Sequence, residues 1–463
     1  MMNITQTDEK ASDIPKVRTA ERKQWDDTIN LVLNGIGTLY SNYFKVFVKQ
    51  SEFRNTWNVF IRYLETLLER QSFEVNTTVF VVLKHVLEKV DKPDNLDSPS
   101  TEDVWMMWSG QGVKLVEGNM ETSRAGIQET LSAYVDSLKP LYRLLEPTIS
   151  TDMVDKILTL LWECIIFPDA PAYFQDIDIL TPLQATILEV IQMMRTDIPG
   201  VPSLVLKKVA DLSTVAYRPP HTPQSTKVRI PSYIALAAQS MKVLETVSFR
   251  HVESSEIYTT GALSSVLSAL KLPISLKYDF ARAASSAAAK RPSQWIPATK
   301  VVLSIITKAL PAIDKLNINE AHQKEVWKLI VEIIGSVVSA NTTDIEEATL
   351  TSDETFDISS FQEFRSLIIP PLGRAVVPDE VVEAYVKSIF KSSILYDIAE
   401  LEHPGSTDTS LSSLSIRKHG KTSELELVRR SRMSYACLDE LFALAAVNDS
   451  GIHPTYPPSR GYC

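Results

Sequence analysis

Apolar residues recur at steps of three and four along most of this chain, and this period constrains its fold most strongly. An α-helix turns once in 3.6 residues, so such spacing places apolar side chains along one face. The clearest stripes cover residues 57–68 and 79–90 and are separated by a polar break over 71–76. They predict two antiparallel amphipathic helices that pack against each other. Their members are Trp57, Phe60, Ile61, Leu64, Leu67 and Leu68, then Val79, Val82, Leu83, Val86, Leu87 and Val90.

A longer stripe precedes this pair, and comparable helix pairs follow it. The preceding stripe consists of Trp25, Ile29, Val32, Leu33, Ile36, Tyr40, Tyr43, Phe44 and Phe47. The later pairs are expected over 128–167, 181–216, 232–271, 296–339 and 361–395. A spacing of about 40 residues per pair is typical of HEAT and armadillo repeats, although no repeat-to-repeat identity is visible.

Chain length agrees with a stack of such pairs. At 463 residues the chain exceeds the roughly 250 to 300 residues at which one hydrophobic core stops growing. The β-branched run Val301 to Thr307 lies inside a longer helical window, so it does not predict a strand. We therefore predict an all-α fold, an irregular α-solenoid of HEAT/armadillo-like helix pairs, with a single helix bundle as the competing arrangement.

Proline, serine and acidic residues divide the predicted helices into blocks. The expected order is a disordered N-terminal segment (1–22), a first helical-repeat block (23–217), a Pro-rich linker (218–230), a second helical-repeat block (231–340), an acidic loop (341–360), a helical pair (361–402), a Ser-rich mobile loop (403–424), a terminal helix (425–448) and a disordered tail (449–463).

Charge and cysteine content limit the environment. The formal net charge of -10 disfavours a phosphate backbone as the main partner, so we expect no nucleic acid. Cys164, Cys437 and Cys463 lie far apart without CxxC spacing, which favours a reducing, cytosolic compartment. The N-terminus lacks the apolar core of a signal peptide, and no apolar run approaches the roughly 20 residues that span a bilayer. Any membrane contact is expected to be peripheral.

Motifs for chemistry are absent from the sequence. It contains no phosphate-binding loop, dinucleotide-binding turn or nucleophile elbow. The seven histidines form no HExxH motif or compact cluster. Cys437 and Cys164 lie on apolar stripes, where burial raises a thiol pKa, so both are expected to be core residues. We therefore predict a protein that is not an enzyme and that uses no cofactor, metal or small-molecule substrate.

Two surface features are candidate contact sites. One is a basic cluster that could contact anionic lipid or an acidic partner, with a solvated helix start as the alternative. Its members are Arg417, Lys418, Lys421, Arg429, Arg430 and Arg432. The other is a partner-docking patch made of Trp105, Met106, Met107 and Trp108, because Trp and Met often anchor interfaces. These four residues fit the core side of a short helix equally well.

Several segments resemble a known family. The run from Ser51 to Val90, SEFRNTWNVFIRYLETLLERQSFEVNTTVFVVLKHVLEKV, is similar to the C-terminal helical region of the Mon-two (monensin-sensitivity) family, relatives of the large Arf guanine nucleotide exchange factors. Phe364 to Asp397 and the later segment RRSRMSYACLDELFAL look like the closing part of that region in fungal members. The resemblance extends from about Trp25 to Leu444 and rests on packing motifs.

The resemblance implies a non-catalytic scaffold in protein transport and vesicle-mediated transport. Such a scaffold would be cytoplasmic and peripheral on trans-Golgi and endosome membranes. The implied partners are a Dopey-family protein, a phospholipid flippase and an Arf-like GTPase. Family members are much longer, so this chain is expected to be a C-terminal portion or a truncated product.

Three other interpretations compete with this one. The chain could be the C-terminal regulatory region of an Arf-type exchange factor, although the exchange domain is missing. It could also be an armadillo-type adaptor of another pathway, for which a regular ladder of Asn, Trp or acidic residues would be expected. An unrecognised enzyme would require a deep polar pocket with convergent titratable groups.

Overall fold

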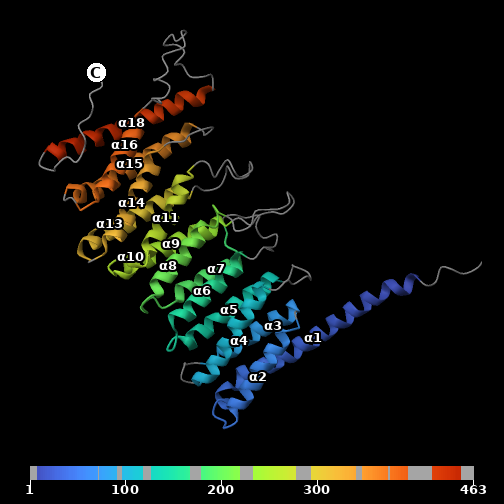
Figure 1. Ribbon diagram of the computed structural model, residues 1–463. Helices are drawn as coiled ribbons and strands as arrows, with labels where there is room; N and C mark the ends of the chain where they lie inside the picture. The colour runs from blue at the N-terminus through green and yellow to red at the C-terminus, as the bar shows by residue number, and fades with distance from the viewer. Residues whose placement is uncertain are drawn as a thin grey trace, which may run out of the picture. The chain divides into compact units, whose positions relative to one another are not determined.

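The computed structural model describes residues 8–70, 72–90, 96–117, 127–166, 179–218, 233–277, 294–316, 318–339, 347–373, 376–394 and 420–449. Of these described residues, 84% are helical and none is in a strand. The predicted all-α class is therefore confirmed. Figure 1 shows the helices in order along the chain.

Sixteen helices are assigned in the described residues. They are α1 (Asp8–Phe47), α2 (Phe53–Leu68), α3 (Phe73–Leu87), α4 (Ser98–Glu117), α5 (Ile127–Leu145), α6 (Thr151–Ile166), α7 (Pro182–Met193), α8 (Val201–Thr214), α9 (Ile234–His251), α10 (Glu256–Thr259), α11 (Ala262–Ser275), α13 (Trp295–Lys315), α14 (Glu320–Val338), α15 (Glu347–Gly373), α16 (Asp379–Ser393) and α18 (Gly420–Asp449).

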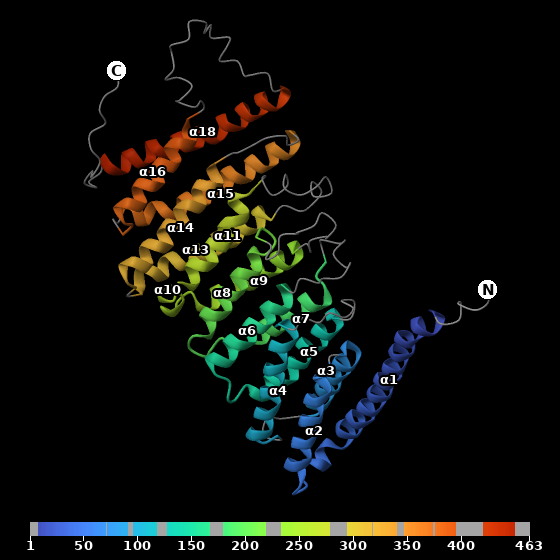
Figure 2. The same ribbon diagram turned by 45° about the vertical axis from the view of Figure 1, so that its right-hand side comes forward.

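These helices divide into two compact units. The first contains α1 to α7 and the second contains α10 to α18, while α8 and α9 contribute residues to both. In the first unit α1, α3, α5 and α7 pack side by side as one layer, and α2, α4 and α6 form a second layer (Figure 2). In the second unit α11, α14 and α16 form one layer and α13, α15 and α18 the other. Each unit is thus a stack of antiparallel helix pairs, as a solenoid requires.

Local sequence signals explain where several helices begin. The Ser72 side chain accepts a hydrogen bond from the Val75 amide at the start of α3. At α7, Thr181 and Gln184 form a capping box, and at α14 the Asn319 side chain accepts from the Ala321 amide. Such caps satisfy backbone donors that have no partner inside the helix.

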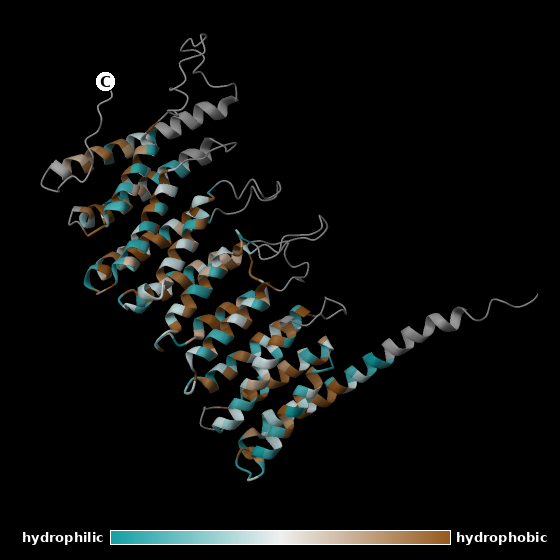
Figure 3. Cartoon of the chain, in the orientation of Figure 1, coloured by the Kyte–Doolittle hydropathy of each residue, from teal (hydrophilic) through white to brown (hydrophobic). Residues whose placement is uncertain are grey.

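Burial in the first unit follows the predicted stripes closely. All twelve residues of the two clearest stripes are buried. Trp57 is fully buried, as predicted, between the rings of Tyr40, Phe44 and Phe60, and its indole Nε1 donates to the Ser100 carbonyl at 3.1 Å. The stripe on α1 is only partly covered, because Trp25, Val32 and Tyr43 remain exposed while Leu33, Tyr40 and Phe44 are buried. Figure 3 shows hydrophobic and hydrophilic residues alternating along the helices.

The layer of α3, α5 and α7 is also joined by a ladder of alternating charges. Lys84 on α3 pairs with Asp136 on α5, and Lys139 lies 3.1 Å from Asp136 and 2.6 Å from Glu189 on α7. Burial opposes ionisation of Asp136, yet the hydrogen bonds from Lys84 and Lys139 hold its pKa below the usual value. The ladder therefore links three successive helices of this layer.

Three predicted irregular segments are wrong in part, because they contain helix. α1 begins at Asp8, inside the segment expected to be disordered, where Glu, Lys, Arg and Ala favour helix without an apolar stripe. α15 begins at Glu347, so 347–360 is helix rather than an acidic loop. Its acidic side chains at 354 and 357 are buried and face cations from distant segments. α18 begins at Gly420, five residues earlier than the expected terminal helix. The remainder of these loops lies outside the described residues.

One helix departs from the expectation that no segment is long and apolar enough to cross a membrane. Among the described residues, α13 meets that criterion by length and composition, with a mean hydropathy of 1.5 in its most apolar window. However, 61% of that window is buried inside the protein, and α13 packs against α11 and α15. This burial is typical of a core helix.

Candidate functional site

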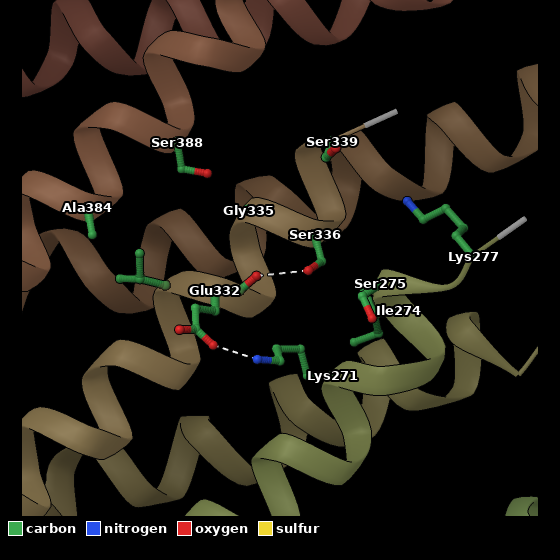
Figure 4. Close-up of a pocket in the computed structure, with 11 residues that line it drawn as sticks. Lys271, Ile274, Ser275, Lys277, Glu332, Gly335, Ser336, Ser339, Ala384 and Ser388 are labelled. Atoms are coloured by element: carbon green, nitrogen blue, oxygen red, sulfur yellow. Dashed lines mark hydrogen bonds and ion pairs between the residues drawn. The ribbon is translucent and has the colours of Figure 1, made fainter. Parts of the chain in front are cut away.

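A groove of about 680 Å³ opens on the layer formed by α11, α14 and α16 in the second unit (Figure 4). Small and polar residues line it, together with two lysines and one glutamate. The full set is Lys271, Ile274, Ser275, Lys277, Val331, Glu332, Gly335, Ser336, Ser339, Ala384 and Ser388. These residues lie on three helices that are far apart in the sequence, apart from Lys277 and Ser339, which follow the ends of α11 and α14. The groove is therefore a product of the stacking.

Gly335 and Ser336 on α14 contribute to the shape and the polarity of the groove. A Cβ placed on Gly335 would lie 2.7 Å from the Ser388 Oγ, so the absent side chain lets α14 approach α16 closely. The Ser336 hydroxyl donates to the Glu332 carbonyl of its own helix at 2.9 Å. This hydroxyl is thus satisfied locally, as is common for serine within helices.

An ion pair crosses the groove between α11 and α14. The Lys271 ammonium lies 2.5 Å from the Glu332 carboxylate, and Figure 4 shows the two side chains pointing toward each other. Both are partly exposed, so water screens the pair and its contribution to stability is small. It presents both signs of charge to a molecule that enters the groove.

A second ion pair lies at the end of the groove and is almost completely buried. The Lys277 ammonium donates to both Asp357 carboxylate oxygens at 2.8 Å and to the Val337 carbonyl at 3.3 Å. It also sits 4.3 Å from the centre of the Trp295 ring, a cation–π contact. Since Asp357 falls in the predicted acidic loop, sequence reasoning missed this pair. Lys277 and Asp357 are 80 residues apart, so no local sequence pattern connects them.

Three charged side chains line the groove, two lysines and one glutamate. None of its eleven residues is a histidine or cysteine, and its one carboxylate, Glu332, pairs with Lys271. Among the described residues no cluster of His, Cys, Asp and Glu has the arrangement of a metal site.

The described cysteines are core residues, as predicted. Burial raises the pKa of the Cys164 thiol to about 12. The pKa of the Cys437 thiol is also raised to about 12, mainly by burial and to a smaller extent by the negative charge of Glu440. A thiol with such a pKa stays protonated near neutral pH and is a poor nucleophile. Cys463 lies outside the described residues.

A buried polar cluster surrounds Cys437 where α15, α16 and α18 meet. The Tyr385 hydroxyl donates to Glu440 at 2.9 Å, and Arg365 forms an ion pair with the same carboxylate. Burial raises the pKa of Glu440 despite these two partners, and burial also raises that of Tyr385. The cluster joins three helices, and Glu440 and Tyr385 are both buried. A structural role follows from this burial.

The basic cluster is only partly covered by the structure. Arg417 and Lys418 lie outside the described residues, whereas Lys421, Arg429 and Arg430 fall on α18 without described side chains. Arg432 is described and lies 3.3 Å from the buried carboxylate of Glu354 on α15. The Arg432 charge is therefore paired with Glu354 within the protein.

The four residues of the predicted docking patch do not share one surface. Trp105, Met107 and Trp108 are buried, and only Met106 is exposed, at 61%. Trp108 stacks on Tyr134 at 4.4 Å, and its indole Nε1 donates to the Tyr134 carbonyl at 3.1 Å. The packing of these three side chains is that of core residues.

Comparison with known proteins relates this chain to one curated protein. The sequence is 19% identical to Protein MON2 of Saccharomyces cerevisiae over 444 aligned residues, which cover 91% of this chain and 27% of MON2. This match supports a relationship to MON2. The chain spans about a quarter of that relative's length. No protein-family model matches the sequence.

Proposed function

We propose that this chain is a non-catalytic scaffold in transport between the Golgi and endosomes. The observation that carries the proposal is the match to MON2 along 91% of the chain. The Mon-two resemblance adds that the chain corresponds to the C-terminal part of a longer, fungal-type protein. Stacked helix pairs support this role, because such stacks present long surfaces to partners.

The partner proposed from the resemblance is a Dopey-family protein, and a phospholipid flippase and an Arf-like GTPase belong to the same assembly. We propose the groove of α11, α14 and α16 as the contact surface. Its ion pair and its serines offer both donors and acceptors, and its volume of about 680 Å³ accommodates several side chains of a partner.

Affinity purification of the tagged chain from its host, followed by mass spectrometry, tests the proposal. Ala384 is exposed in the groove, so Ala384→Trp fills the groove from its rim. Ala445→Trp is the matched control, because Ala445 is exposed on α18 away from the groove lining. We expect the Dopey-family protein with wild type and control, and a clear loss with Ala384→Trp.

The possible results separate the two parts of the proposal. Recovery of the partner with both variants would remove the groove as contact surface and leave the scaffold role intact. Failure to recover any transport protein with the wild type, together with an even cytosolic distribution of the fluorescently tagged chain, would overturn the scaffold role itself.

Membrane attachment is proposed to be peripheral and indirect. Flotation of the purified chain with anionic vesicles at physiological salt measures direct attachment, and we expect little. The charge-reversal variant is Arg429→Glu with Arg430→Glu, and Arg432 is left unchanged because it pairs with Glu354. The control reverses the exposed residues Lys207 and Lys315. Strong flotation of the wild type, abolished only in the first variant, would instead make the basic cluster a lipid site.

A further inference from the structure

A second groove, of about 370 Å³, lies within the second unit and shares two helices with the first. Its lining residues lie on α8, α11 and α14, apart from Arg218 and Gly261, which lie just outside α8 and α11. Seven of the twelve lining residues carry a hydroxyl or a charge. The second groove is therefore a polar site.

The two grooves follow one another along the same faces of α11 and α14, which pack side by side. On each helix three lining residues recur at steps of three and four, which places them on one face. They are Ser268, Lys271 and Ser275 on α11, and Leu329, Glu332 and Ser336 on α14. The first residue of each set lines the second groove, and the other two line the first groove (Figure 4). The grooves thus form one furrow between α11 and α14.

One hydroxyl that lines the second groove has no hydrogen-bond partner among the described residues. It belongs to Ser264, which is only 6% exposed. The neighbouring hydroxyls of Ser265 and Thr214 donate to the Gly261 and Asp211 carbonyls at 3.1 and 2.8 Å, so they remain available as acceptors. A polar group that is buried without a partner is costly, and a ligand in the groove removes that cost.

The charges that line the second groove favour a basic ligand. Asp211 on α8 and Glu325 on α14 form no ion pair with any described residue. The Asp211 side chain is exposed, yet the protein around it excludes enough water to raise its pKa, and the Lys208 charge offsets this only in part. Arg218 is the single cation of the lining and is exposed. Two acids against one base leave the groove negative, which complements a positive group.

We propose that the furrow binds an extended segment of a protein partner, with a lysine or arginine side chain of that segment in the second groove beside Asp211 and Glu325. The furrow extends about 16 Å along α11 from Ser264 to Ser275, which is about five residues of extended chain. The hydroxyls of the lining pair with the backbone donors and acceptors of the segment. This inference extends the contact surface proposed above and rests on it for the identity of the partner.

Protection of single cysteines by a capped hexaarginine peptide tests the site without the partner. In a Cys463→Ser background the other two native thiols are buried. Ser268→Cys places a thiol in the second groove and Ser275→Cys places one in the first, both at exposed positions. With the peptide at about ten times its Kd, we expect thiol reagents to label both positions about tenfold more slowly. Ser359→Cys, which is exposed on α15 outside both grooves, is the control and should be labelled at an unchanged rate.

Two charge variants test the role of the acids. Asp211→Asn with Glu325→Gln removes both carboxylates and should weaken binding of hexaarginine at least about tenfold, because charge-assisted hydrogen bonds are lost. Glu253→Gln with Glu363→Gln makes the same change in net charge at exposed positions outside the furrow, and this control should bind as the wild type does. Circular dichroism checks that each variant is folded.

The outcomes separate the parts of the inference. Absence of protection at both cysteines would refute the site. Equal protection in the two charge variants, or stronger protection by hexaglutamate, would refute the basic side chain. Protection of Ser268→Cys without protection of Ser275→Cys would refute the extended segment. None of these results depends on capture of the Dopey-family protein, which Ala384→Trp tests separately.

Discussion

The buried pair of Lys277 and Asp357 offers a sharp test of how the second unit is stabilised. Their side chains are 5% and 2% exposed, and two hydrogen bonds of 2.8 Å join them. Removing one partner leaves a charge in the interior, which costs about 3 to 5 kcal/mol. We therefore expect Lys277→Met and Asp357→Leu each to lower the free energy of unfolding by that amount.

The double variant should behave differently, because neither charge is then left alone. Lys277→Met with Asp357→Leu replaces the pair by apolar side chains of similar size, and the loss should be less than about 1 kcal/mol. The single losses would thus fail to add by several kcal/mol, which is the signature of direct coupling. A matched surface control is Glu383→Gln, which breaks the exposed pair with Lys387 and should cost less than about 1 kcal/mol.

Hydrogen exchange measured across α11 and α15 during urea unfolding is the appropriate assay. The chain has two compact units, so a single unfolding transition cannot be assumed. Exchange reports on the helices that flank the pair, and circular dichroism follows the whole chain. Equal and additive losses in the two single variants and the double variant would show that the two charges do not compensate each other, and the reasoning would then fail.

Further predictions concern packing, thiol reactivity and pH. Trp57→Ala should lower the free energy of unfolding by about 3 to 5 kcal/mol through lost burial and a cavity, and an unchanged denaturation midpoint would contradict this. Gly112→Ala places a Cβ 2.0 Å from the buried Tyr134 hydroxyl and should cost at least about 1 to 3 kcal/mol, while Gly35→Ala, with open space around it, should stabilise α1 slightly. In a Cys463→Ser background, thiol reagents should label Cys164 and Cys437 only as the protein unfolds, and rapid labelling of the native state would disprove their burial. The pKa of Asp136 is lowered in the folded protein, so its contribution to stability is fully present at pH values above its ordinary pKa of 3.8. This contribution is lost as the pH falls through the lowered pKa. Asp136→Asn should therefore reduce the loss of stability at acid pH, measured by unfolding at a series of pH values.

The sequence predicted the fold correctly where a helix buries one face in the core. The stripes over 57–68 and 79–90 predicted the packing of α2 and α3, because burial of one face is enough to set the period of the sequence. It failed at α15, where Glu354 and Asp357 gave the appearance of a solvated loop. The cations that face these acids, Arg432 and Lys277, lie about 80 residues away in either direction. Pairing over such distances leaves no local pattern.

The groove was missed for a related reason. Its residues are small or charged, so no stripe or motif marks them, and only the stacking of α11, α14 and α16 brings them together. The docking patch had the opposite difficulty, since two tryptophans at a spacing of three suit either a core or an interface. The structure distinguishes the two interpretations, because Trp108 is buried and stacks on Tyr134, whereas Met106 is exposed.

The stacking of helix pairs bears on how the groove of α11, α14 and α16 would bind a partner. Bulky apolar residues are buried between neighbouring helices, so the groove is lined mainly by small and charged residues. Contacts through such a lining depend on hydrogen bonds and charges, and charge interactions are screened by salt. Raising the ionic strength should therefore weaken the capture of a partner by the groove, whereas an unchanged capture at high salt would show that the contact is mainly apolar.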